Sequence, residues 1–270
     1  MQSRVPRSYL FVPANRPERF EKAFAAGAHA IIIDLEDSVP SSEKTAARTA
    51  AANWLSQNKP TLVRLNGSAT EWFADDLKLC ALPGVAGVVL PKCETIEDLR
   101  LVEEHGGQRL PLMPIIETAR GFWNALALAQ AYLVDRLVFG SIDLQLDLGI
   151  RGEGIELDYF RSQLVLVSRL AGIRSPVDGI CTSIHDAEIL RAETLRALRF
   201  GFGGKLCIHP EQVSVVNQSF LPSPEEILWA RRVLDAASAS GGAAVALDGT
   251  MVDRPIIAQA EAILRQLEPA

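Results

Sequence analysis

Two acidic residues follow apolar runs in the middle of the chain, and their spacing suggests chemistry at one edge of a sheet. Glu117 ends the run of residues 110–116, and Asp143 ends residues 137–142, which are apolar apart from a Gly-Ser pair. A short apolar run is typical of a buried strand, so each acid is expected at a strand's carboxyl end. In parallel α/β proteins that edge binds ligands. For either acid alone, the alternatives are a helix cap and an ion pair with an arginine.

The residue types around these acids favour a hard cation. No His or Cys lies near Glu117 or Asp143 in the sequence. Mg²⁺ prefers one or two carboxylates, with water and substrate oxygens at its other positions. Glu36 and Asp37, which follow another apolar run, are expected to support the cation through its bound waters.

Basic residues at other expected strand ends suggest an anionic substrate. Arg64 and Arg16 offer planar donors for a carboxylate or a phosphate. A 2-oxo acid chelates Mg²⁺ through its carboxylate and keto oxygens, and the cation offsets the charge that moves during carbon–carbon cleavage. The rival chemistry is a Schiff-base aldolase, which needs a desolvated lysine facing the barrel interior. Lys92 and Lys205 are its candidates, although an ion pair for Lys92 and a structural role for Lys205 are the plain alternatives.

Eight strand–helix units are expected to position these side chains. Eight is the strand count of a TIM (β/α)8 barrel, and right-handed crossovers make a closed barrel the natural solution. Residues 1–221 are therefore predicted to form the barrel. The expected strands are residues 9–14, 30–35, 61–65, 85–90, 110–116, 137–142, 177–180 and 204–208.

Two further regions lie outside this regular pattern. Residues 222–270 are predicted to form a C-terminal helical extension, with helices at 224–240 and 255–267. A small-residue linker at 238–244, with Gly241-Gly242 as a flexible joint, precedes a short extended segment or loop. Residues 144–157 contain three glycines and are the longest expected loop, either a lid or a plain surface excursion.

Composition narrows the class of protein. The chain has 270 residues, is 48% hydrophobic and has a formal net charge of −6, which argues against non-specific binding to nucleic acid or anionic membranes. No apolar run approaches the roughly 18 residues of a membrane span, and no signal-peptide core is present near the start. The four cysteines lack metal-type spacing and are expected to be reduced and mostly buried. A soluble, cytoplasmic protein is expected.

Motifs along nearly the whole chain resemble one known family. The chain is similar to the citrate lyase β-subunit-like (CitE-like) family within the HpcH/HpaI aldolase superfamily. The matching stretches, in order, are RSYLFVPANRPERFEKA, IIIDLEDSVP, LVRLNG, VVLPKCE, PIIETARG, FGSIDLQLDLG, GKLCIHPEQV and GTMVDRPIIAQA.

This resemblance implies roles for individual residues. Glu117 and Asp143 match the family's Mg²⁺ ligands, and Arg64 matches the arginine that binds the substrate carboxylate. Arg16 lies where relatives approach the substrate or the thioester carrier. Asp253 by itself is typical of a helix N-cap. In CoA-using relatives, however, the matching acid completes the site of a neighbouring subunit in a trimer. This implies a homo-oligomer, with a trimer favoured, and a proton-transfer role for Asp253.

The resemblance also implies a reaction class. The leading hypothesis is a Mg²⁺-dependent lyase that cleaves a 3-hydroxy dicarboxylic acyl thioester, carried by CoA or an acyl-carrier protein, to a 2-oxo acid and an acyl thioester. Thioester hydrolysis or malate-synthase-like condensation at the same site is the runner-up, and a non-catalytic CoA- or carrier-binding scaffold is the third. Two departures bear on the substrate: Ile142 stands where relatives commonly have glutamate, and Ala14 where they often have glycine.

Overall fold

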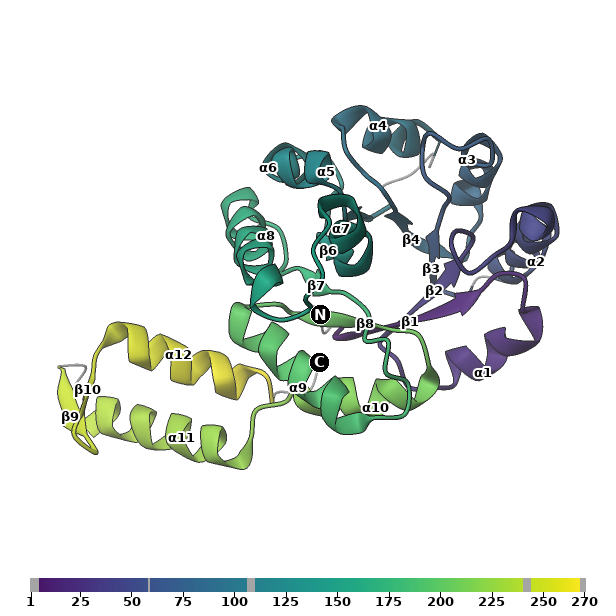
Figure 1. Ribbon diagram of the computed structural model, residues 1–270. Helices are drawn as coiled ribbons and strands as arrows, with labels where there is room; N and C mark the ends of the chain where they lie inside the picture. Colours follow the sequence, from purple (N-terminus) through teal and green to yellow (C-terminus); the bar gives the residue numbers. More distant parts are fainter. Residues whose placement is uncertain (1–4, 58, 106–109, 240–243, 268–270) are drawn as a thin grey trace. The chain divides into compact units, whose positions relative to one another are not determined.

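The computed structural model describes residues 5–57, 59–105, 110–239 and 244–267. Its first compact unit, Pro6–Asn217, is built on a closed barrel of eight parallel strands arranged in chain order (Figure 1). The predicted TIM-barrel fold with a C-terminal helical extension is therefore confirmed. The strands are β1 Ser8–Pro13, β2 Ala30–Asp34, β3 Thr61–Arg64, β4 Val85–Leu90, β5 Leu112–Ile116, β6 Val138–Phe139, β7 Val177–Asp178 and β8 Gly204–Cys207.

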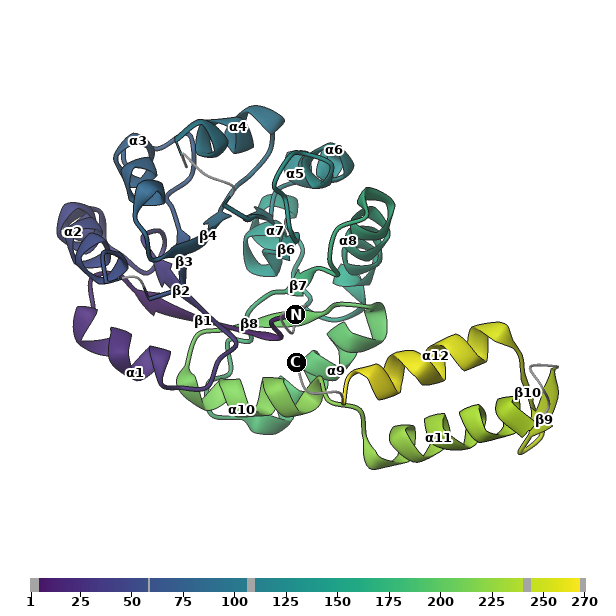
Figure 2. The same ribbon diagram turned by 180° about the vertical axis from the view of Figure 1, so that it is seen from behind.

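Helices surround the barrel on its outer side, as the views from the front and from behind agree (Figures 1 and 2). Their bounds are α1 Phe20–Phe24, α2 Lys44–Leu55, α3 Phe73–Asp76, α4 Ile96–His105, α5 Ala119–Trp123, α6 Ala125–Ala129, α7 Ser141–Leu148, α8 Asp158–Ala171, α9 Ala187–Phe200 and α10 Pro210–Ser219. Short 3₁₀ helices at Pro17–Arg19, Ser41–Glu43, Leu77–Ala81 and Ile155–Leu157 complete the connections.

Inward-facing side chains fill the barrel with one apolar cluster. Its buried members are Tyr9, Ile32, Leu62, Val89, Met113, Ile115, Val138, Val177 and Leu206. Successive residues of a strand face opposite sides. Residues two positions beyond Ile32, Leu62 and Ile115 therefore continue the inward face toward the carboxyl end. Those positions are Asp34, Arg64 and Glu117, so the apolar core forms the floor of the polar site.

The amino end of the barrel is closed by a fully buried guanidinium. Arg136 is 0% exposed. It donates hydrogen bonds to the Tyr9 hydroxyl at 2.8 Å, to the Pro6 carbonyl at 2.7 Å and to the Ser175 carbonyl at 2.7 Å. Because Pro6 precedes β1 and Ser175 precedes β7, this one side chain ties together three parts of the barrel floor. Burial disfavours the charged form of Arg136, and the uncharged oxygens that accept its hydrogen bonds do not offset this. The pKa of Arg136 therefore lies below its ordinary value.

The sixth strand is shorter than predicted, and this moves Asp143. We expected residues 137–142 to be a strand ending at Asp143, but β6 ends at Phe139 and α7 begins at Ser141. Asp143 lies in the first turn of α7, where the helix dipole favours a carboxylate. The loop expected at 144–157 is shorter than predicted: α7 continues to Leu148 and a 3₁₀ helix covers Ile155–Leu157, so residues 149–154 form the loop. An apolar run alone does not distinguish a strand from the first turn of a half-buried helix.

Other local predictions need smaller corrections. The helical segment after Glu117 is divided into α5 and α6 at Asn124. The Thr118 hydroxyl caps α5 by accepting a hydrogen bond from the Gly121 N–H at 3.0 Å. The four cysteines are free and buried, as predicted. Among the described residues, no helix is both long enough and apolar enough to cross a membrane.

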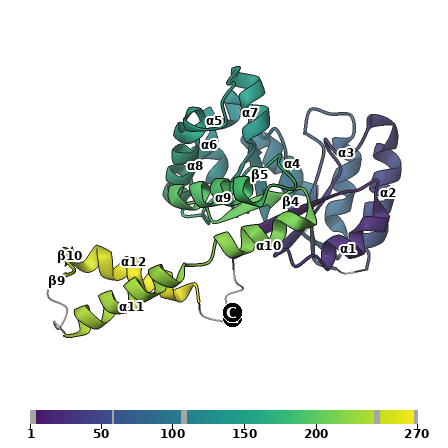
Figure 3. The ribbon, with the colours of Figure 1, turned by 60° about the horizontal axis from the view of Figure 1, so that its bottom comes forward.

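Most of the second compact unit is the chain from Gln218 onward. Helices α11 Pro224–Ala239 and α12 Arg254–Arg265 lie antiparallel and share an apolar core that includes Ala230, Val233, Val252 and Ala260 (Figure 3). The segment predicted as extended or loop is a hairpin of β9 Val245–Leu247 and β10 Thr250–Val252. The predicted joint at Gly241-Gly242 lies outside the described residues. The boundary between residues 221 and 222 stays a prediction.

Candidate active site

A cavity of about 430 Å³ opens above the core at the carboxyl ends of the strands. Its floor is apolar, formed in part by Phe11, Ile115 and Leu206. Charged residues from four parts of the chain line its wall: Asp34, Asp37, Arg64, Glu117 and Asp143. Four of the residues selected from the sequence are therefore brought together around one cavity, and Asp34 joins them.

Arg64 is held by a buried bidentate ion pair. Its Nε and Nη2 donate to the two carboxylate oxygens of Asp34 at 2.6 and 2.7 Å, and the two residues are register partners on β2 and β3. The guanidinium carbon also lies 4.6 Å from the centroid of the Phe11 ring. Burial raises the pKa of Asp34, but the charge and hydrogen bonds of Arg64 outweigh it, so the pKa lies below its ordinary value.

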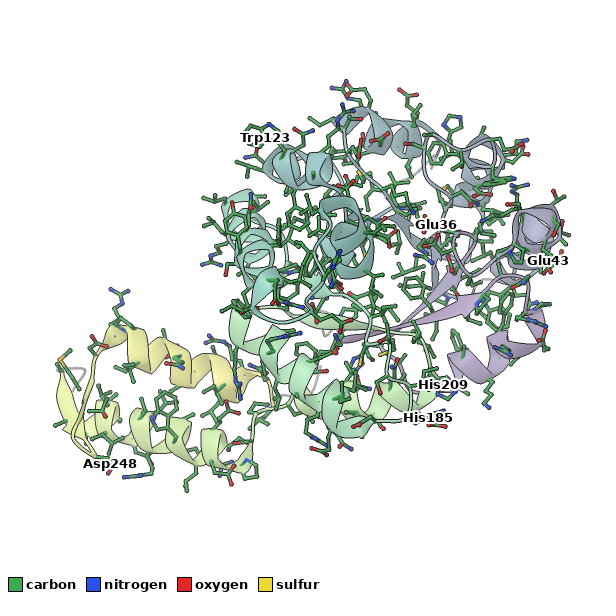
Figure 4. All side chains as sticks on the ribbon, in the orientation of Figure 1. Glu36, Glu43, Trp123, His185, His209 and Asp248 are labelled. Atoms are coloured by element: carbon green, nitrogen blue, oxygen red, sulfur yellow. The ribbon has the colours of Figure 1, made fainter. Side chains whose placement is uncertain are left out.

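Glu36 links the two basic side chains of the site. Its Oε1 accepts a hydrogen bond from the Lys92 ammonium at 2.6 Å, and its Oε2 lies 3.0 Å from Nη1 of Arg64. Figure 4 shows Glu36 within the ring of helices. Lys44, which was not selected from the sequence, holds this turn: its ammonium donates to the Leu35 and Glu36 carbonyls at 2.7 and 2.8 Å. The Glu36 carboxylate is thus fixed from both its backbone and its side chain.

Among the carboxylates of the site, Glu117 is the one that has no ion pair with a basic side chain in the described part of the chain. It is 4% exposed, and its Oε1 accepts a hydrogen bond from the Lys92 backbone N–H at 2.7 Å. Among the residues that the structure describes, no ammonium or guanidinium lies within ion-pair distance of it. Burial, together with the negative charges of Glu36 and Asp143, raises the pKa of Glu117 to about 8. A buried carboxylate with this environment would be stabilised by a positive ion.

The donor set fits an octahedral hard cation rather than a soft one. Glu117 and Asp143 line the same cavity, and within the described ranges no group of three or more His, Cys, Asp or Glu side chains is arranged to hold a metal. Two carboxylates with room for several waters is the arrangement that Mg²⁺ prefers. Asp37 is more exposed and lies 3.8 Å from Arg64 and 4.0 Å from Lys92. Its predicted role of holding metal-bound water remains a prediction.

Gly140 makes room for the Glu117 carboxylate. A Cβ atom at position 140 would lie 2.3 Å from Oε2 and 2.4 Å from Cβ of Glu117. Neither distance is compatible with a side chain, so only glycine allows the backbone just after β6 to pass so close to Glu117. The glycine between Phe139 and Ser141 is therefore part of the site.

The remaining candidate residues have other surroundings. Arg16 is exposed and precedes the 3₁₀ helix Pro17–Arg19. Asp253 caps α12, where its Oδ1 accepts from the Ile256 N–H at 3.4 Å. Lys205 is 1% exposed and pairs with Asp178 at 2.8 Å. Its neighbour Leu206 faces the barrel interior, so Lys205 faces the helices, which does not suit a Schiff-base lysine.

Binding of a divalent cation at pH 7 is expected to release close to one proton. Glu117, with a pKa of about 8, is mostly protonated at pH 7 and must lose its proton to bind a metal. The apparent affinity should therefore rise about tenfold per pH unit up to pH ~8 and then level off. Calorimetry at one pH, in buffers of different ionisation enthalpy, measures the released protons. Binding without proton release would show that Glu117 is already ionised or is not a ligand.

Arg64→Lys is expected to weaken both stability and substrate binding. One ammonium cannot make both bonds to Asp34, so the free energy of unfolding should fall by about 1–3 kcal/mol. If Arg64 also binds the substrate carboxylate, KM should rise about tenfold or more. Arg48→Lys is the control, because Arg48 also binds a buried carboxylate, Asp76, but does not line the cavity. A similar loss of stability in both variants, with KM unchanged, would assign Arg64 to structure alone.

Known proteins resemble this chain along almost its whole length. A family model described as HpcH/HpaI aldolase/citrate lyase matches residues 7–210. A citrate lyase subunit beta-like protein of Deinococcus radiodurans is 37% identical, with 96% of each chain covered. A (3S)-malyl-CoA thioesterase of Cereibacter sphaeroides is 34% identical over 95% of each chain. The structure of CitE from Mycobacterium tuberculosis in complex with magnesium, acetoacetate and coenzyme A has a TM-score of 0.86 and 35% identity, covering 98% of this chain and 99% of that one.

Proposed function

Because the chain belongs to the HpcH/HpaI aldolase/citrate lyase family, we propose that it is a Mg²⁺-dependent carbon–carbon lyase. Its substrate would be a 3-hydroxy dicarboxylic acyl thioester of the citryl, citramalyl or malyl type, and its products a 2-oxo acid and an acyl thioester. The observation that carries the proposal is the buried, cation-free Glu117 beside Asp143 in a cavity that also contains Arg64. CitE of M. tuberculosis has been crystallised with magnesium and with pyruvate or oxaloacetate, which supports ligands of this class.

The residues around the cavity would divide the work of cleavage. Glu117 and Asp143 would hold Mg²⁺, which when bound offsets negative charge on the oxygens of the 2-oxo acid. Arg64, fixed by Asp34, would orient the substrate carboxylate. A base removes the proton of the 3-hydroxyl, the carbon–carbon bond breaks to release a thioester enolate, and an acid protonates that enolate. Asp253 is proposed for one of these two proton transfers.

Asp253 would act in a homo-oligomer, most simply a trimer, in which it serves a neighbouring subunit. The N-cap contact uses Oδ1 of Asp253, which leaves the role of its other oxygen open to test. Since α12 packs on α11 in a shared apolar core, the extension would approach a neighbour as one helical pair rather than as a single helix. Arg16, which is exposed, is proposed to contact the CoA or acyl-carrier arm of the thioester.

A second candidate function is thioester hydrolysis at the same site. The specific observation in its favour is the 34% identity to (3S)-malyl-CoA thioesterase over 95% of each chain. The sequence departure at Ile142 also falls in the cavity wall, next to Asp143. An isoleucine there changes the polarity of the wall without removing a proposed metal ligand.

A panel of acyl-CoA thioesters with and without Mg²⁺ separates the candidates. The 2-oxo acid and the free thiol are measured independently. A lyase releases 2-oxo acid in a Mg²⁺-dependent manner with little free thiol. Free thiol without 2-oxo acid indicates hydrolysis. Consumption of glyoxylate and acetyl-CoA with release of free thiol indicates malate-synthase-like condensation, whereas a lyase running in reverse consumes both without releasing thiol. A scaffold that only binds CoA or a carrier gives none of these products, although CoA binding would still be measurable by calorimetry.

A further inference from the structure

Lys92 contacts the proposed metal ligands through two different parts of the residue. It follows β4 with a φ of 48°, a left-handed conformation that is uncommon for a residue with a side chain. This backbone geometry accompanies the 2.7 Å hydrogen bond from its N–H to Oε1 of Glu117. The main chain of Lys92 therefore fixes one oxygen of Glu117, and this contact does not depend on the side chain.

The ammonium of Lys92 lies among the other carboxylates. It donates to Glu36 at 2.6 Å and lies 3.8 Å from Asp143 and 4.0 Å from Asp37. The contact with Glu36 is a charge-assisted hydrogen bond, whereas the contact with Asp143 is a looser ion pair. The tight contact anchors the ammonium, and the loose one can be exchanged.

The charges around the cavity explain why an ammonium is needed there. Five carboxylates face two basic side chains, and the guanidinium of Arg64 is engaged by Asp34 and Glu36. Within the described residues, Lys92 provides the ion pair to Asp143. The carboxylates are Asp34, Glu36, Asp37, Glu117 and Asp143.

We propose that Lys92 is the positioning residue of the metal site: its N–H fixes Glu117, and its ammonium holds Asp143 until a divalent cation takes that place. This inference rests on the proposed function for the cation itself. When the cation binds, the ammonium gives up Asp143 and keeps Glu36. Two positive charges close to one carboxylate repel each other, so the ammonium lowers metal affinity while it stabilises the metal-free protein.

Metal affinity measured without turnover tests this role. Binding of Mn²⁺ is followed by calorimetry and by the electron paramagnetic resonance signal of the free ion. Lys92→Met removes the ammonium at similar length. Lys92→Gly also removes the ammonium, keeps the N–H that donates to Glu117 and suits the positive φ at this position. It provides a second test if Lys92→Met does not fold. Lys78→Met is the matched control, because it removes an ammonium paired with Asp75 on the surface, away from the cavity.

Both Lys92 variants are expected to bind Mn²⁺ about tenfold more tightly than wild type, while Lys78→Met binds as wild type does. Their metal-free forms should melt at lower temperature, so the rise in Tm on adding metal should exceed that of wild type. Unchanged or weaker Mn²⁺ binding in both Lys92 variants would overturn the exchange of cations at Asp143. If wild type itself binds no Mn²⁺, the proposed function fails first, and the inference fails with it.

Discussion

Glu117→Gln is expected to lower kcat by about 10³-fold or more and to abolish measurable Mg²⁺ binding. Loss of a ligand removes the several kcal/mol of charge stabilisation that a bound cation supplies, and each ~1.4 kcal/mol is a factor of ten in rate. Glutamine keeps the size of the side chain and can still accept the hydrogen bond from the Lys92 N–H. The variant should therefore fold normally, which a thermal melt will check. Calorimetry with Mg²⁺ and steady-state kinetics measure the two losses.

Glu94→Gln is the matched control for this variant. Glu94 lies on the neighbouring loop, where its Oε1 accepts a hydrogen bond from the Thr118 hydroxyl at 2.8 Å, and it does not line the cavity. Its replacement should change kcat less than about threefold. Wild-type Mg²⁺ affinity in Glu117→Gln would remove Glu117 from the metal site. Equal losses in both variants would indicate a general effect of lost negative charge.

Asp253→Asn is expected to lower kcat by about 10²–10⁴-fold, the usual contribution of a general acid or base. Its effect on stability should be small, at most about 1 kcal/mol, because asparagine also caps helices well. Asp186→Asn is the control: Asp186 caps α9 by accepting from the Glu188 and Ile189 N–H groups, and it is not a candidate catalytic residue. A loss of activity in Asp253→Asn alone separates catalysis from capping.

Mixing two inactive variants tests whether Asp253 serves a neighbouring subunit. When Glu117→Gln and Asp253→Asn chains are co-refolded in equal amounts, about a quarter of the shared sites should receive both native groups. Activity should then return to roughly that fraction of wild type. If Asp253 serves its own chain, every site lacks one group and mixing restores nothing. Size-exclusion chromatography with light scattering will establish the assembly in the same samples.

The sequence patterns predicted the barrel well because they report on burial. Seven of the eight strands lie within the expected apolar runs, and β1 begins one residue before its run, at Ser8. The run before Glu117 places that residue directly after β5. Burial patterns do not report on hydrogen-bond partners between adjacent strands. Only the register of β2 on β3 brings Asp34 beside Arg64. Alternation in residues 30–34 could have identified Asp34, since it shares the inward face of Ile32.

Other parts of the site depend on backbone geometry that apolar patterns do not encode. The left-handed conformation of Lys92 brings its N–H to Glu117, and a lysine at that position gives no sign of it. Gly140 was read as a small residue within a strand, whereas it leaves space for the carboxylate of Glu117, which follows the neighbouring strand β5. β6 ends just before this glycine and α7 begins just after it, so Asp143 lies in a helix turn and not at the strand end that the apolar run predicted.

The closed floor of the barrel constrains the order in which products can leave. Arg136 and the apolar cluster above it leave the carboxyl end as the entrance to the cavity. A thioester carrier arm is far larger than a 430 Å³ space, so it must extend outward through that entrance. In the proposed cleavage, the 2-oxo acid next to Glu117 and Arg64 is then the inner product, and the acyl thioester departs before it. In kinetic terms, the acid competes with the substrate for the empty enzyme, and the acyl thioester does not.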